Sequence, residues 1–158
     1  MAFLCMNHRK RLESMTEDQL SQQWCEWMNH AAVNYKKASW KKALAFSGSS
    51  LDLARMCVNN NDNSYQERML HCYCLSTVYS AHLCQRTGQM QRANQLLDTA
   101  CQQLYTLLCS EKSHCIEKDF RHFTEILLNP DLHQCYLSQF TRLPYEPMAV
   151  VQPKKALH

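Results

Sequence analysis

The side chains best suited to chemistry in this chain are its ten cysteines and eight histidines. Both residue types bind transition metals, and a cysteine with a histidine nearby can act as a nucleophile. The densest group is LHCYCLS, in which His71 and Cys74 share one face of a predicted helix while Cys72 points elsewhere. A structural zinc site needs two ligand pairs, and the other dense group, at 109–115, straddles a predicted loop. We therefore predict no metal site and no cofactor.

Catalytic arrangements of these residues are also not indicated. His71 with Cys72, and His114 with Cys115, are sequence neighbours, and adjacent side chains on a helix diverge by about 100°. His82 lies on a predicted helix, but the residues after it, LCQRTG, lack the lysine and glycine that follow a phosphotransfer histidine closely. The sequence contains no glycine-rich phosphate loop, paired-carboxylate signature or zinc-protease motif. We predict that the protein is not an enzyme.

Charge and hydropathy exclude two further classes of partner. The formal net charge of +3 is small, and basic residues fall in separate clusters at 8–11, 36–42 and 154–155. A nucleic-acid interface would need such residues on one face, with aromatic platforms or a recognition helix. The first residues, MAFLC, are too few and too weakly apolar for a signal peptide, and no run of about 18 apolar residues follows. We expect a cytoplasmic protein with reduced cysteines, no nucleic-acid partner and no membrane partner.

The elements that position these residues are predicted to be helices only. Two glycines and four prolines in 158 residues leave few turn signals for a many-stranded fold. Thr16 with Gln19, and Ser64 with Glu67, form capping-box patterns that begin helices. Further caps are expected at Ser39, Ser113 and Asn129. Apolar residues at three- and four-residue steps then predict six helices, at about 17–37, 40–58, 65–87, 89–110, 114–128 and 130–140.

The domain organisation follows from the ranges of the predicted helices. Residues 1–15 are expected to be a flexible segment, 16–142 a helical domain, and 143–158 an extended tail, since PYEPMAVVQPKKALH contains three prolines. Two roles for the tail remain open. Its apolar residues, with those left on the terminal hairpins, could pack on a second copy and make a homodimer. Alternatively, the tail occupies a groove of its own chain as a placeholder.

A pattern of small and bulky residues occurs twice, fifty positions apart. Two antiparallel helices approach closely where small side chains face each other, and a bulky neighbour fills the remaining groove. Hairpins of this kind leave a second apolar side open, so they stack. The five size-matched pairs are Ala31 with Ala81, Ala38 with Gly88, Trp40 with Met90, Ala43 with Ala93, and Ser50 with Ala100.

This pattern resembles the tetratricopeptide repeat, a helix-turn-helix unit of 34 residues. The resemblance covers residues 24–110 and departs from the family in its fifty-residue period and in having Ala38 where glycine is usual. It implies stacked antiparallel helix hairpins. The matching residues are Trp27, Ala31, Ala38, Trp40, Ala43 and Ser50 in the first unit, then Ala81, Gly88, Ala93 and Ala100 in the second.

The resemblance also implies where a partner would bind. In the family, peptide ligands lie along the concave side formed by the first helix of each hairpin. The lysine and asparagine of the family's carboxylate clamp are missing here, so capture of an acidic chain terminus in that manner is not expected. The corresponding positions are Met28, Ala32, Tyr35 and Lys36, then Val78, His82, Gln85 and Arg86.

We therefore predict a non-catalytic protein-protein interaction module of an adaptor, chaperone-like or regulatory kind, which binds a protein or peptide segment in a helical-repeat groove. The alternative is a metal- or redox-responsive regulator that uses the cysteine and histidine set. The two classes differ in a simple observable, because the second requires metal in the purified protein or thiols that oxidise readily.

Overall fold

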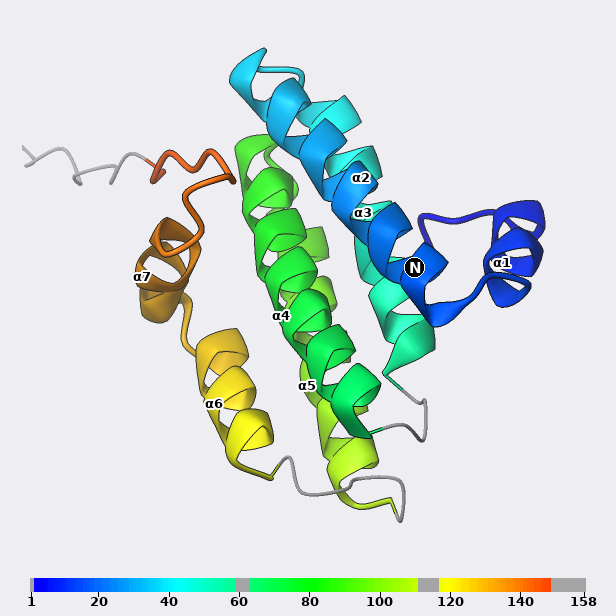
Figure 1. Ribbon diagram of the computed structural model, residues 1–158. Coiled ribbons are helices and arrows are strands. Elements are labelled where there is room, and N and C mark those ends of the chain that lie inside the picture. The colour runs from blue at the N-terminus through cyan, green and yellow to red at the C-terminus, as the bar shows by residue number, and fades with distance from the viewer. Residues whose placement is uncertain (1, 59–62, 111–116, 149–158) are drawn as a thin grey trace, which may run out of the picture.

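Helices make up most of the described parts of the chain, in agreement with the predicted all-α class. The computed structural model describes residues 2–58, 63–110 and 117–148. Within these ranges no strand is present. The elements are α1 (Met6–Glu13), α2 (Glu17–Lys36), α3 (Trp40–Cys57), α4 (Asn63–Arg86), α5 (Met90–Leu108), α6 (Glu117–Leu128), the 3₁₀ helix η1 (Pro130–Leu132) and α7 (His133–Ser138) (Figure 1).

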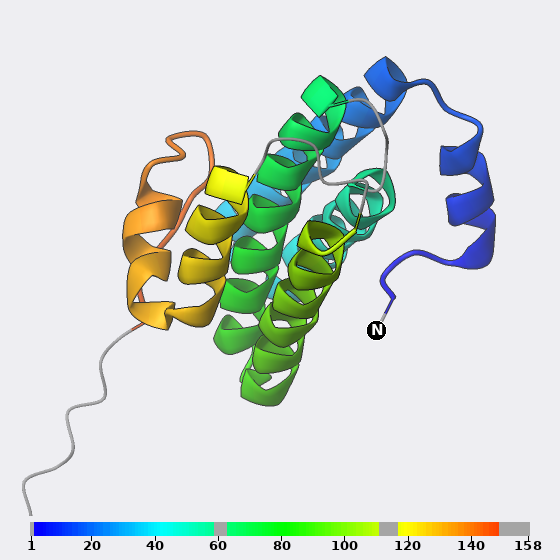
Figure 2. The same ribbon diagram turned by 90° about the horizontal axis from the view of Figure 1, so that it is seen from below.

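The helices stack as a row of hairpins. α2 and α3 form one antiparallel pair, and α4 and α5 form the next, packed against the first through α3 and α4. α6 then packs on α5, and α7 contacts α4. The two views agree that α4 lies between the α2–α3 pair on one side and α6 with α7 on the other (Figures 1 and 2). The prediction of stacked helix hairpins is confirmed, with α1 as a helix beyond the six predicted.

Small residues let these helices approach closely, as the repeated pattern predicted. Ala31, Ala43, Ala81 and Ala93 are all 0% exposed. At the contact of α3 with α4, the hydroxyl groups of two buried serines, Ser47 and Ser80, are hydrogen-bonded at 2.9 Å. The two helices can therefore pack closely at this point while both serine hydroxyl groups keep a hydrogen-bond partner.

The fifty-residue offset also holds for backbone geometry at the two hairpin turns. Gly88 has a φ of 74°, and its counterpart Ala38 has a φ of 55°, so both lie in the left-handed region. In both hairpins the amide of the next residue donates to a carbonyl five positions back: from Ser39 to Asn34 at 2.9 Å, and from Gln89 to Cys84 at 2.8 Å. This is the hydrogen bond that closes a Schellman motif. Ala38 adopts this conformation against the preference of its Cβ atom.

Two of the predicted helix caps are confirmed. The Thr16 hydroxyl accepts from the Gln19 amide at 3.2 Å, and the Gln19 side chain accepts from the Thr16 amide at 2.9 Å, which completes a capping box. The Asn129 side chain accepts from the Asp131 amide at 3.2 Å and begins η1. Since a capping side chain satisfies an orphan backbone donor, both helix starts are fixed by local sequence.

Other predicted boundaries need correction. Ser39 occupies the N-cap position of α3, but its side chain makes no capping hydrogen bond, so the predicted serine cap is wrong. The predicted sixth helix is divided into η1 and α7, which ends at Ser138. The caps predicted at positions 64 and 113 fall on side chains outside the described part of the structure.

The N-terminal residues, which we expected to be flexible, contain α1 and a docked segment before it. The amides of Phe3 and Leu4 both donate to Asp52 Oδ2, at 2.5 and 3.0 Å. The Phe3 ring lies against Gly48 of α3, where a Cβ atom would collide with it, and the Arg92 guanidinium lies 4.8 Å from the ring centre. The glycine inside α3 thus makes room for an aromatic ring, at the helix-weakening cost that glycine carries.

Candidate functional site

Tyr35, His82 and Arg86, three of the sequence-predicted site residues, lie on one surface, which we call the α2–α4 face. It consists of the sides of α2 and α4 over which residues 139–148 return after α7 (Figure 1). Tyr35 and His82 lie at its centre and are 3% and 5% exposed. The Tyr35 hydroxyl and His82 Nε2 are 2.8 Å apart, and their rings stack with centroids 5.8 Å apart. Two residues predicted from separate repeats therefore form one unit.

The chain's own C-terminal segment, residues 144–148, crosses this face. The Tyr79 hydroxyl donates to the Pro144 carbonyl at 2.9 Å, and the Glu146 amide donates to the Tyr35 hydroxyl at 2.8 Å. The Arg86 guanidinium donates to both the Glu146 carbonyl, at 3.0 Å, and its carboxylate, at 3.1 Å. Three side chains of the face thus bind backbone groups of an irregular segment without secondary structure.

Side chains of the segment add aromatic and charge contacts. The Tyr145 ring packs on the His82 ring with centroids 4.6 Å apart and a tilt of 56°. The carboxylate of Glu146 pairs with Arg86, but that glutamate side chain is 74% exposed. Solvent-exposed ion pairs contribute little to stability, so the backbone hydrogen bonds and the ring contact carry most of the interaction.

The protonation state of His82 is compatible with a continuous chain of hydrogen bonds through Tyr35. Burial, with a further contribution from the positive charges of Arg86 and His133, lowers the pKa of His82 from 6.5 to about 4. The imidazole is therefore neutral at pH 7, and its Nε2 can accept the Tyr35 hydroxyl proton. The Tyr35 oxygen is then free to accept from the Glu146 amide, so one hydroxyl links the histidine to the C-terminal segment.

The other predicted site residues differ in their burial and in their neighbours. Met28 is buried and lines a cleft on the α2–α4 face. Gln85 is partly buried and lines a smaller cleft beside Tyr145. Lys36 is exposed, and its side chain makes no hydrogen bond or ion pair with the described residues. Val78 is 0% exposed and belongs to the hydrophobic core, so it has no surface to offer a partner in this conformation.

An open cleft, which we call the Trp24 cleft, continues the face toward the start of α2. Its volume is about 380 Å³, and two further clefts, of about 460 and 440 Å³, also have Trp24 in their walls. The Trp24 indole donates to the Ser76 hydroxyl at 3.2 Å, which holds α2 to α4. The repeat pattern could not reveal this cleft because half of its wall comes from 139–143. Its lining residues are Trp24, Cys25, Met28, Asn29, Leu75, Gln139, Phe140, Thr141, Arg142 and Leu143.

The buried cysteines have the environment of structural residues, whereas Cys5, Cys25, Cys109 and Cys135 are exposed, and Cys5 Sγ lies 3.0 Å from His8 Nδ1. All nine within the described ranges are free thiols, and Cys115 lies outside those ranges. Burial raises the pKa of both Cys72 and Cys74 to about 12, so both thiols stay protonated at neutral pH and are poor metal ligands or nucleophiles. Cys74 is buried while His71 is exposed, so the pair noted in LHCYCLS does not point to one site.

Comparison of this chain with protein-family models, curated proteins and solved structures gave no match. The resemblance to the tetratricopeptide repeat therefore stays a prediction. Among the described helices, none is both long and apolar enough to cross a lipid bilayer.

Proposed function

We propose that this protein is a non-catalytic interaction module whose α2–α4 face binds an extended segment of a partner protein. The observation that carries the proposal is the manner in which Tyr35, Tyr79 and Arg86 bond to backbone groups of residues 144–146. An extended peptide leaves its amides and carbonyls free for such bonds, whereas a helix uses them internally. The face is therefore suited to extended chains.

The chemistry of the C-terminal segment indicates the kind of partner. Tyr145 and Glu146 lie between Pro144 and Pro147, and proline disfavours a helix because it lacks an amide proton. An aromatic ring fits against His82, and an acidic residue after it fits Arg86. We expect a partner segment in which an aromatic and an acidic residue are adjacent and flanked by prolines.

The Trp24 cleft gives the same partner an apolar anchor. Residues 139–143 line the cleft and lead directly into 144–146, so the two parts of the surface are adjacent. The wall is largely apolar, with Trp24, Met28, Leu75 and Phe140 among its residues. A hydrophobic side chain next to the proline-flanked motif would bury its surface there.

In this proposal the C-terminal segment acts as a placeholder that a partner must displace. A segment tethered to its own site has an effective concentration on the order of millimolar, so a free peptide competes poorly until the segment is removed. Binding in trans should therefore be measured on a variant whose own segment is weakened.

The test uses the full-length double variant Y145A/E146A and a fluorescent peptide, RLPYEPM, corresponding to residues 142–148. We expect the peptide to bind the double variant roughly tenfold or more tightly than the wild-type chain, because its competitor is weakened. Adding Tyr35→Phe and Arg86→Ala to the double variant should then reduce that binding, since these side chains hold the backbone of the segment.

Two controls make the result specific. A peptide with alanine at both the tyrosine and glutamate positions should bind weakly to every variant. Lys41→Ala changes an exposed cation outside the α2–α4 contacts and should leave peptide binding unchanged. Equal peptide affinity of the wild-type chain and Y145A/E146A, or no loss with Tyr35→Phe and Arg86→Ala, would contradict the proposal.

A further inference from the structure

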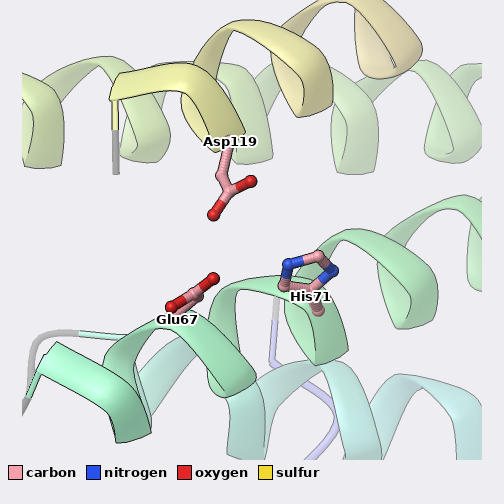
Figure 3. A group of neighbouring side chains, drawn as sticks. All are labelled: Glu67, His71 and Asp119. Atoms are coloured by element: carbon pink, nitrogen blue, oxygen red, sulfur yellow. The ribbon is translucent and has the colours of Figure 1, made fainter. Parts of the chain in front are cut away.

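Three side chains that commonly bind divalent metals meet where the N-terminal half of α4 lies beside the first turn of α6. Glu67 and His71 come from α4, and Asp119 comes from the first turn of α6 (Figure 3). Their ligand atoms all lie within 4.8 Å of one another. In Figure 3 the two carboxylates and the imidazole point toward a common space between the helices.

The positions of these residues follow from helix geometry and packing. Glu67 and His71 are four residues apart, so they lie on the same face of α4. The His71 ring packs edge-on against Phe123 of α6, with centroids 4.7 Å apart and planes at 87°. Because Phe123 lies one turn after Asp119, this contact keeps the imidazole beside the aspartate. Two packed helices, rather than a loop, thus hold the three groups.

Among the described residues, no lysine or arginine side chain forms an ion pair with either carboxylate. In the same part of the chain, none of the three side chains has a hydrogen-bond partner. Two carboxylates at this separation repel each other unless a cation lies between them. Glu67 and His71 are exposed and Asp119 is partly buried, so an ion can reach all three from solvent.

We propose that Glu67, His71 and Asp119 together bind one divalent transition-metal ion of the Zn²⁺ class, which links α4 to α6. One imidazole and two carboxylates suit Zn²⁺, Co²⁺ or Mn²⁺ better than Ca²⁺, which prefers oxygen ligands alone, or Cu⁺, which prefers sulfur. Ligand atoms on one such ion are about 3 to 3.5 Å apart, so small rotations of exposed side chains complete the site. Three protein ligands leave at least one coordination position for water.

The sequence contained a signal for this site that a search for cysteine and histidine pairs overlooks. ERMLH, residues 67–71, places a carboxylate and a histidine one helical turn apart. The third ligand lies about fifty residues further along the chain, and only the packing of α6 beside α4 brings it close. The proposed ion would also hold α6 in place, and α6 leads through α7 to residues 139–148.

The experiment is a titration of metal-free, fully reduced, full-length protein with Co²⁺, followed by absorption spectroscopy. We expect saturable binding of one equivalent of Co²⁺, with weak visible bands and without the intense near-ultraviolet absorption of a sulfur ligand. Each of the variants Glu67→Gln, His71→Ala and Asp119→Asn should weaken binding by at least about tenfold. The ion should also raise the melting temperature of the wild-type chain and not that of His71→Ala.

The matched controls are Glu26→Gln, His30→Ala and Asp98→Asn, which remove the same groups from exposed positions on α2 and α5. These should bind Co²⁺ as the wild-type chain does, and melting of all variants in chelator shows whether each is folded. Binding that persists in His71→Ala, or a spectrum dominated by sulfur-to-metal absorption from the exposed cysteines, would overturn the proposal. Absence of saturable Co²⁺ binding below about 1 mM would overturn it as well.

Discussion

Replacing Tyr35 with phenylalanine should separate the stability of the helical body from the docking of the C-terminal segment. The change removes one hydroxyl and with it two hydrogen bonds of 2.8 Å, one to His82 Nε2 and one from the Glu146 amide. The ring and its contacts remain, including the edge-on packing on Trp40 with centroids 4.9 Å apart. Phenylalanine therefore isolates the effect of the hydroxyl.

The two lost bonds have different consequences. The bond to Glu146 joins the segment to the body, and a net contribution of about 0.5 to 1.5 kcal/mol would make undocking roughly 2 to 13 times more favourable. The bond to His82 lies within the body, where the imidazole is 5% exposed. Leaving that nitrogen without a donor should lower the free energy of unfolding by about 1 to 3 kcal/mol.

Hydrogen exchange of the Glu146 amide, measured by NMR, reports undocking directly, because this amide is the donor to Tyr35. Urea unfolding followed by circular dichroism reports the stability of the body. Tyr79→Phe removes only the bond to the Pro144 carbonyl, so it should weaken docking by a similar factor. Tyr105→Phe is the matched control, since that side chain is 70% exposed and should change neither quantity.

Two different results for Tyr35→Phe would contradict the two roles of its hydroxyl. If Tyr35→Phe leaves the exchange rate of the Glu146 amide equal to that of the wild-type chain, the hydroxyl does not hold the segment. If exchange accelerates but urea stability is unchanged, the account of His82 as a buried acceptor is wrong, while the docking account stands. The two measurements therefore test separate steps.

Three other predictions use the same structure. Chemical denaturation should show that Ala38→Gly raises the free energy of unfolding by about 0.5 to 1 kcal/mol and that Gly88→Ala lowers it by a similar amount, since both positions have positive φ. A Cβ atom at Gly88 meets nothing within 4 Å, so the effect there comes from the backbone conformation and not from a clash. The free energy of unfolding should fall by up to about 3 kcal/mol as the pH is lowered from 6.5 to about 4, because in this range His82 is protonated in the unfolded chain but not in the folded chain. In urea titrations, His82→Gln should flatten this pH dependence. Gly48→Ala should displace Phe3 and increase proteolytic cleavage before α1, because the new Cβ atom meets the Phe3 ring, while the free energy of unfolding of the helical body changes by no more than about 1 kcal/mol. Unchanged cleavage before α1 in this variant would show that the ring does not lie against Gly48.

The sequence by itself determined the helices, the hairpins and part of the α2–α4 face. Apolar periodicity, the capping box at Thr16 and the turn at Gly88 are local signals, and each has its expected geometry. The fifty-residue offset also predicted the burial of the four alanines, and the family resemblance put Tyr35 and His82 in one predicted groove. These features follow because helix phase and turn conformation depend on residues within a few positions of each other.

Only the tertiary structure decided which residues far apart in the sequence contact each other. Glu146 meets Tyr35 across 111 residues, Phe3 meets Asp52 across 49, and Asp119 joins Glu67 on another helix. Burial also divided neighbours that share a helix face, since Val78 enters the core while His82 meets the C-terminal segment. No local pattern encodes these pairings, because they depend on how whole helices pack, and a packing arrangement is a property of the assembled chain rather than of any short stretch.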